Sequence, residues 1–235
     1  MYEQATGLWR TPRGAEAVFE YRQDTIDWNV INSTLEGDEY GLGVLALEGW
    51  AFDVGAYVGS VAIALALDNP GLRVLAIEPV PDNVRLCRAN VERNRLSERI
   101  TVLDGAVGPR GETSVRVCYG YEGSELARYH AFVANVASIG HSEVPHEDRD
   151  VVGYSLSSLV ALAGELPAFV KIDCEGAEWG FLSDPVTAQL PRVHGEWHPA
   201  EGRIRADLEA MLAPTHALTF TGPLAGPGGF VAVRR

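Results

Sequence analysis

Five short apolar runs, each containing or followed by an acidic residue, recur through the middle of the chain and restrict its fold. The first three acidic residues, Asp53, Glu78 and Asp104, are separated by 25 and 26 residues. Such intervals have room for one helix, so the pattern predicts βαβ units and a parallel sheet. The predicted buried strands are Trp50–Val54, Arg73–Ile77, Ile100–Leu103, Ala168–Ile172 and Arg192–Trp197.

Helical patterns fill the intervals between these strands. Gly59–Leu67 is rich in Ala and Leu, Pro81–Asn94 begins with a Pro-Asp pair suited to a first helical turn, and Arg203–Leu212 carries apolar residues on one face. His216–Phe220 and Phe230–Val233 are joined by a Gly/Pro loop too short for a helix, so they must be antiparallel. The predicted class is α/β: a doubly wound, Rossmann-like, mostly parallel seven-stranded sheet with a C-terminal antiparallel hairpin.

Two segments fall outside this repeat. Residues 1–49 are predicted to form an N-terminal helical cap, in which Asp24 caps a helix. Residues 50–235 form the main domain. Within it, residues 120–150 form an insertion after the third strand, which is either a lid over a substrate or a solvated loop.

The charge balance restricts the partners of the chain. There are 32 acidic and 19 basic residues, a net charge of −13, which repels phosphate backbones and excludes nucleic acid as an expected partner.

The longest apolar stretch, Val54–Leu67, is interrupted by glycine and is shorter than the roughly 20 residues that span a bilayer. Three widely spaced cysteines form no disulfide framework, so a cytoplasmic protein is expected. A homo-oligomer is left open.

The carboxyl ends of the predicted strands are where an open parallel sheet binds its ligand. In Asp53-Val-Gly-Ala-Tyr-Val-Gly59, a strand runs through a glycine turn into a helix, which brings backbone amides close to a ligand. The Gly-x-x-x-Gly spacing differs from that of dinucleotide sites. Glu78 is placed to bind ribose hydroxyls, Asp104 an adenine amino group and Asp53 an ammonium. An adenosine linked to an amino acid fits these groups better than a dinucleotide.

Four motifs stand out at the predicted strand ends: Phe52-Asp-Val-Gly-Ala-Tyr-Val-Gly59, Ile77-Glu-Pro-Val-Pro-Asp-Asn83, Val170-Lys-Ile-Asp-Cys-Glu-Gly-Ala-Glu178 and Glu196-Trp-His-Pro199. With these motifs the sequence, from about Tyr21 to Val233, resembles the FkbM-type family of class I S-adenosylmethionine-dependent methyltransferases. Tyr57 stands where that family usually has a small polar residue, and Asp104-Gly105 where it often has Asn-Ala.

The resemblance implies a set of residues that bind S-adenosylmethionine and its product S-adenosylhomocysteine (SAH). Glu78, next to Pro79, takes the ribose, and Asn83 and Asp104 flank the adenosine. Tyr40 closes the site from the N-terminal side or packs in the core. The residues around the methionyl part are Asp53, Gly55, Tyr57 and Gly59.

The run from Lys171 to Trp179 carries three carboxylates, Asp173, Glu175 and Glu178, which repel one another unless a cation or donor compensates. Glu178 is expected to cap the following helix or to face solvent on it, whereas Asp173 ends its strand and is expected to meet the substrate.

His198 ends the neighbouring strand, where Asp173 or Glu196 could orient it as a general base. Alternatively, Asp173, Glu196 and His198 hold a Mg²⁺ that binds a vicinal diol. This is not favoured, because histidine is an unusual magnesium ligand.

The predicted function is methyl transfer from S-adenosylmethionine to a hydroxyl of a small molecule, such as a sugar or a polyketide-like natural product of secondary metabolism. Within the class, metal-assisted transfer to a diol and N-methylation are alternatives. Outside it, the alternatives are a nicotinamide-dependent oxidoreductase, against which the glycine spacing and the closing hairpin argue, and a cofactor-binding module without catalysis.

Overall fold

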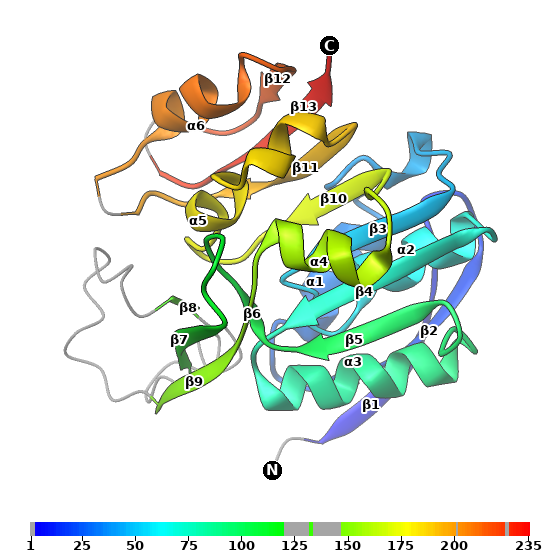
Figure 1. Cartoon of the computed structure of the whole chain (residues 1–235). Coiled ribbons are helices and arrows are strands. Elements are labelled where there is room, and N and C mark those ends of the chain that lie inside the picture. The colour runs from blue at the N-terminus through cyan, green and yellow to red at the C-terminus, as the bar shows by residue number, and fades with distance from the viewer. Residues whose placement is uncertain (1–2, 120–131, 134–146, 201, 224–225) are drawn as a thin grey trace.

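A seven-stranded sheet forms the centre of the molecule in the computed structural model, which describes residues 3–119, 132–133, 147–200, 202–223 and 226–235 (Figure 1). Its order is β12-β13-β11-β10-β3-β4-β5, and only β13 runs antiparallel to its neighbours. The strands are β3 (Gly49–Val54), β4 (Leu72–Glu78), β5 (Ile100–Asp104), β10 (Phe169–Ile172), β11 (Arg192–Trp197), β12 (His216–Phe220) and β13 (Gly228–Arg234). The predicted sheet and closing hairpin are confirmed.

Helices cover both faces of the sheet because successive strand residues point to opposite sides. In β3, Ala51 packs with α1, α2 and α3 and with the N-terminal strands, whereas Phe52 packs with α4, α5 and α6. In Figure 1, α4 lies in front of the sheet and α2 behind it. The helices are α1 (Asp27–Leu35), α2 (Ser60–Asp68), α3 (Pro81–Arg93), α4 (Leu156–Ala163), α5 (Glu178–Leu182) and α6 (Arg205–Leu212), with 3₁₀ turns at Leu42–Val44 and Pro185–Gln189.

The N-terminal segment differs from the predicted helical cap. It begins with an antiparallel hairpin of β1 (Gln4–Arg10) and β2 (Glu16–Arg22), and a single α-helix, α1, follows. Asp24 has a left-handed backbone (φ 60°) and lies before the helix, which Ile26 precedes without a side-chain cap. The hairpin forms because alternate residues such as Phe19 enter the core, a two-residue period that favours a strand.

The predicted insertion after the third strand contributes to a small second sheet of order β6-β9-β7-β8. Its remaining residues, with the predicted lid, lie outside the described residues. Among the described ranges, no helix combines the length and apolar character needed to cross a bilayer. The strands are β6 (Ala106–Val107), β7 (Ser114–Tyr119), β8 (Phe132–Val133) and β9 (Glu147–Tyr154).

Candidate active site

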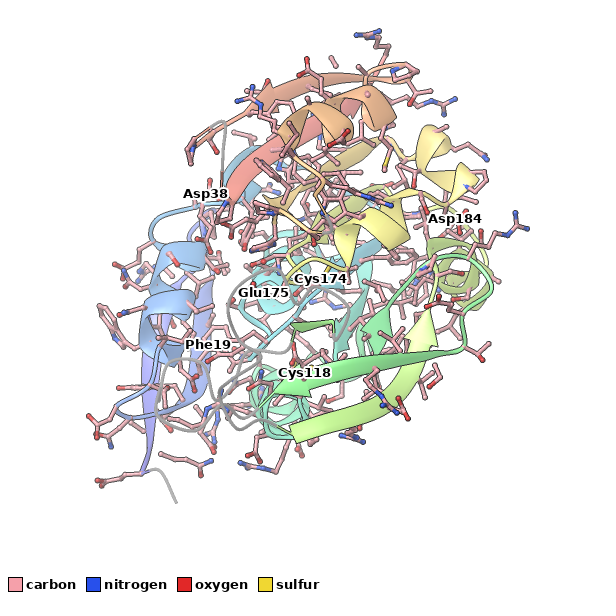
Figure 2. The ribbon with its side chains drawn as sticks, turned by 90° about the vertical axis from the view of Figure 1, so that its left-hand side faces the viewer. Phe19, Asp38, Cys118, Cys174, Glu175 and Asp184 are labelled. Carbon is pink, nitrogen blue, oxygen red and sulfur yellow. The ribbon has the colours of Figure 1, made fainter. Side chains whose placement is uncertain are left out.

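A pocket opens at the carboxyl ends of β3, β4 and β10, with about 850 Å³ of empty space including the part open to solvent. This is the position where open α/β sheets bind ligands. Figure 2 labels Cys174 and Glu175, which follow β10 and lie near the middle of the molecule. The wall is supplied by α1, the turn after β3, the end of β4, β6 and the loop after β10, and includes Val30, Tyr40, Gly55, Tyr57, Glu78, Pro79, Gly105, Asp173 and Glu175.

The glycine turn after β3 contributes Gly55, Ala56 and Tyr57 to the pocket wall, whereas Gly59 is not part of it. A Cβ atom on Gly55 would lie 1.7 Å from the backbone oxygen of Asp173, and φ at Gly55 is 75°, so both space and conformation require glycine. At Gly59, where φ is 89°, a Cβ atom would come within 2.9 Å of the Cys87 sulfur. The turn is therefore fixed against β10 on one side and α3 on the other.

Asp53 was expected to face the ammonium group of a ligand, but it faces the ammonium group of a protein side chain. Its Oδ1 lies 3.5 Å from Nζ of Lys171, the only lysine in the chain, and its Oδ2 accepts a hydrogen bond from Ala62 N at 3.0 Å. Burial raises the pKa of Asp53, and Lys171 opposes that shift. Asp53 is fully buried and is not part of the pocket wall, so the prediction that it contacts the ligand is corrected.

Lys171 joins this carboxylate to the glycine turn. Its Nζ donates to the backbone oxygens of Val54 at 3.2 Å and Gly55 at 2.7 Å. Burial lowers the pKa of Lys171, but Asp53 and Asp173 outweigh burial and the pKa is raised. The buried ammonium thus remains charged and acts as a link between β10 and the turn.

Glu78 and Pro79 lie on the pocket wall, as the prediction requires. Oε2 of Glu78 accepts from Tyr57 N at 2.9 Å, and Oε1 accepts from Val80 N and Asn83 Nδ2, each at 3.0 Å. Burial raises the pKa of Glu78, and these hydrogen bonds oppose the rise. They also hold the carboxylate in one orientation at the end of β4.

Two predicted adenosine contacts are placed differently. Asn83 is fully buried and lies beyond Glu78, to which it donates, so it is not on the wall. Asp104 is half-buried and also absent from the wall; its Oδ2 lies 3.9 Å from Nη2 of Arg149. Gly105 and the residues of β6 line this side of the pocket instead.

Tyr40, which was expected either to close the site or to pack in the core, lies in the pocket wall. Its hydroxyl donates to Oδ2 of Asp173 at 2.9 Å, and its ring centre is 5.2 Å from Nζ of Lys171. Burial and the neighbouring Asp173 carboxylate raise the pKa of Tyr40 well above its ordinary value. The side chain therefore stays protonated and orients Asp173.

Asp173, Glu196 and His198 are brought together at the ends of β10 and β11. One ligand atom from each lies within 4.8 Å of the others. Burial and the Asp173 carboxylate raise the pKa of Glu196. The three predicted catalytic residues thus form one cluster, and Asp173 connects the cluster to the pocket.

Glu178 was expected to cap the following helix or to face solvent, but it is fully buried and contacts His198. Its Oε1 accepts from the backbone N of His198 and lies 3.3 Å from the ring Nδ1, whereas Nε2 lies 3.4 Å from Glu175. Glu178, rather than Asp173 or Glu196, is therefore the orienting carboxylate. Left-handed backbone at Glu175 and Gly176 turns the chain inward, a change that residue types alone do not reveal.

His198 should make the stability of the fold depend on pH. Burial lowers its pKa, but Glu178, Glu175 and Asp173 outweigh burial and raise the pKa from 6.5 to about 9. A raised pKa means that the stabilisation is complete below about pH 6.5 and is lost as the pH rises through about 9.

We therefore expect the wild type to lose on the order of 3 kcal/mol more than His198→Gln between about pH 6 and 9.5. Urea unfolding of both proteins at the two pH values checks this. An equal loss in both would contradict the assignment.

Comparison with known proteins places the chain in a protein family. Residues 53–220 match the methyltransferase FkbM domain. The chain is 26% identical over 173 residues to the 31-O-demethyl-FK506 methyltransferase FkbM of Streptomyces tacrolimicus, a match that covers 65% of this chain and 66% of that protein. The chain thus spans slightly less than two thirds of that relative.

Two solved structures are similar to this chain. An rRNA methylase from Streptococcus thermophilus aligns with a TM-score of 0.50 and 11% identity, over 86% of this chain and 95% of that one. An O-methyltransferase from Bacillus cereus in complex with SAH aligns with a TM-score of 0.43 and 17% identity, over 80% and 74% of the two chains. Since the domain match covers most of the chain, the protein belongs to the FkbM family of S-adenosylmethionine-dependent methyltransferases.

Proposed function

We propose that this enzyme transfers a methyl group to a hydroxyl of a small molecule, a sugar or a polyketide-like natural product. The observation that carries the proposal is the cluster of proton-accepting groups, Asp173, Glu196 and His198, beside the pocket. A hydroxyl, unlike an amine, must lose its proton as the new bond forms, and such a cluster supplies that step. The relative from Streptomyces is named as a 31-O-demethyl-FK506 methyltransferase, and the charge of −13 disfavours nucleic acid as acceptor.

The residues at the strand ends fit the cofactor. The Glu78 carboxylate is anchored on the wall, and a carboxylate oxygen has a second lone pair for a ribose hydroxyl. Gly55, Ala56 and Tyr57 of the turn line the pocket, so the backbone of the turn can contact the methionyl part. Pro79 and Gly105 supply the wall on the adenosine side. When bound, S-adenosylmethionine supplies the activated methyl group and its own leaving group.

The protein's own contribution is positioning and proton transfer. Holding the acceptor hydroxyl in line at near-attack distance can contribute roughly 7–11 kcal/mol, and a positioned base about 10²–10⁴-fold in rate. His198 is the proposed base, with its ring oriented by Glu178. Because the pKa of His198 is raised to about 9, the neutral ring is a minor form at pH 7, and transfer should accelerate as the pH rises toward that value.

A divalent cation is the second candidate for activating the hydroxyl. Asp173, Glu196 and His198 each place a ligand atom within 4.8 Å of the others, which is compatible with binding one ion. A mixed set of two carboxylates and one imidazole suits Mn²⁺ or Zn²⁺ as well as Mg²⁺. A bound ion would lower the pKa of a chelating diol and replace the direct base.

One assay tests both candidates. The purified enzyme is incubated with isotope-labelled S-adenosylmethionine and a panel of hydroxylated metabolites, and products are identified by mass spectrometry. We expect label on oxygen, with the rate unchanged by EDTA. Loss of transfer with EDTA and recovery with Mg²⁺ or Mn²⁺ would replace the direct base by the metal-assisted mechanism. Label on nitrogen alone would contradict O-methylation.

A further inference from the structure

A closed ring of hydrogen bonds connects the N-terminal segment to the cofactor site. Arg22 ends β2, Asp27 begins α1, Tyr57 lies in the glycine turn, Asn83 lies in α3 and Glu78 ends β4. Arg22 and Asp27 precede the FkbM domain match, which begins at residue 53. The part of the chain before the family domain therefore contacts the proposed ribose-binding residue through intermediates.

The ring begins with a buried ion pair. Nε and Nη2 of Arg22 each donate to Asp27 at 2.8 Å, and the Arg22 backbone N donates to the same carboxylate at 2.9 Å. Both side chains are almost completely excluded from solvent. Such a forked pair fixes the planes of the guanidinium and the carboxylate relative to each other.

Two hydrogen-bonded paths lead from this ion pair, one to each carboxylate oxygen of Glu78. On one side, Nη2 of Arg22 donates to Asn83 Oδ1 at 2.9 Å, and Asn83 Nδ2 donates to Glu78 Oε1 at 3.0 Å. On the other side, the Tyr57 hydroxyl donates to Asp27 Oδ1 at 2.6 Å, and Tyr57 N donates to Glu78 Oε2 at 2.9 Å. Both carboxylate oxygens of Glu78 are thus oriented through the same ion pair.

The hydrogen-bonded ring also stabilises the conformation of Tyr57. Its backbone is left-handed (φ 52°), a conformation that costs a non-glycine residue about 1–2 kcal/mol. Its hydroxyl bond to Asp27 and the Arg22 guanidinium 5.5 Å from its ring centre hold it there. These two contacts accommodate a large residue where the family usually has a small polar one. The side chain of Tyr57 thereby becomes part of the pocket wall.

We propose that Arg22 and Asp27 are positioning residues that orient Glu78 and Tyr57 for cofactor binding. This inference rests on the proposed function, in which Glu78 binds the ribose. It predicts that the ion pair governs affinity for the ribose hydroxyls and not merely the stability of the fold.

The test uses the full-length chain and the double variant Arg22→Met/Asp27→Leu. Replacing a buried ion pair by apolar residues often preserves stability, whereas removing one partner leaves a buried charge. Kd values for SAH and for its 2′-deoxy analogue are measured by calorimetry. We expect the Kd for SAH to rise at least about tenfold, and the preference for SAH over the 2′-deoxy analogue to shrink, because Asn83 and Tyr57, which donate to Glu78, lose their bonds to Arg22 and Asp27.

Two further variants keep the test decisive. Arg93→Met removes a different ion pair, Arg93–Glu20 at 2.7 Å, which joins α3 to β2, and should leave both Kd values unchanged. Asp27→Asn keeps the side-chain shape and one acceptor oxygen, and should raise the Kd for SAH less than the double variant does. If the double variant does not fold, Asp27→Asn replaces it as the test of the positioning role.

The outcomes separate this inference from the proposed function. If Glu78→Gln weakens SAH binding but the folded double variant, or Asp27→Asn in its place, binds SAH and the 2′-deoxy analogue as the wild type does, the positioning role is overturned. If Glu78→Gln itself leaves both Kd values unchanged, the ribose assignment fails first, and the positioning role with it.

Discussion

His198→Ala is expected to reduce methyl transfer by at least about 10²-fold while the Kd for SAH stays unchanged. The ring lies in the cluster with Asp173 and Glu196 at the ends of β10 and β11, and it is not part of the pocket wall that would contact the cofactor. The loss should therefore appear in the chemical step. Single-turnover rates with labelled S-adenosylmethionine, together with SAH titration, measure the two quantities separately.

The pH profile supplies the control for this prediction. In the wild type, transfer should rise toward about pH 9, the value to which the carboxylates raise the pKa of His198. Glu178→Gln removes the neighbour that contributes most to this rise, so its profile should shift to lower pH. His198→Ala should show no rise of this kind. Undiminished transfer by His198→Ala would remove His198 from the mechanism.

Gly55→Ala is expected to abolish SAH binding and to destabilise the fold much more than the matched variant Gly164→Ala. Both glycines have left-handed backbones, with φ values of 75° and 80°. An added Cβ atom at Gly164 meets nothing within 4 Å, whereas at Gly55 it would meet the backbone oxygen of Asp173 at 1.7 Å. The strain of the left-handed conformation alone costs roughly 1–2 kcal/mol.

The difference between these variants isolates the close approach of the turn to β10. Relief of the Gly55→Ala clash requires backbone movement, because the clashing oxygen is part of the main chain. Circular dichroism melting and SAH titration of both variants check the prediction. Equal melting temperatures, or wild-type SAH affinity in Gly55→Ala, would show that the turn does not have the structure described.

Much of the fold was predictable because strands and helices leave strong local patterns. Each apolar run with its acidic residue became a strand of the central sheet, and the Gly/Pro loop between His216–Phe220 and Phe230–Val233 required an antiparallel pair. The N-terminal hairpin was missed, although Phe19 and its alternate neighbours carry a strand period. A helix was expected after Ala168–Ile172 and is present as α5, whereas α4 was missed.

The sequence predicted which residues lie near the site, but it did not predict which side chains bond to one another there. Strand ends correctly brought Asp173, Glu196 and His198 together. The same reasoning assigned Asp53 to the ligand. However, the Asp53 carboxylate already pairs with Lys171, which lies 118 residues later in the sequence. Residue types cannot show which of several nearby carboxylates a buried cation selects, since that depends on packing across the sheet.

Calorimetric titration of the wild type and Glu78→Gln with SAH tests the central claim, that the pocket at the ends of β3 and β4 binds the cofactor through its ribose. We predict saturable one-site binding by the wild type and at least about tenfold weaker binding by the variant, from loss of a charged hydrogen-bond acceptor. No heat of binding with the wild type, or equal Kd values for the two proteins, would contradict it.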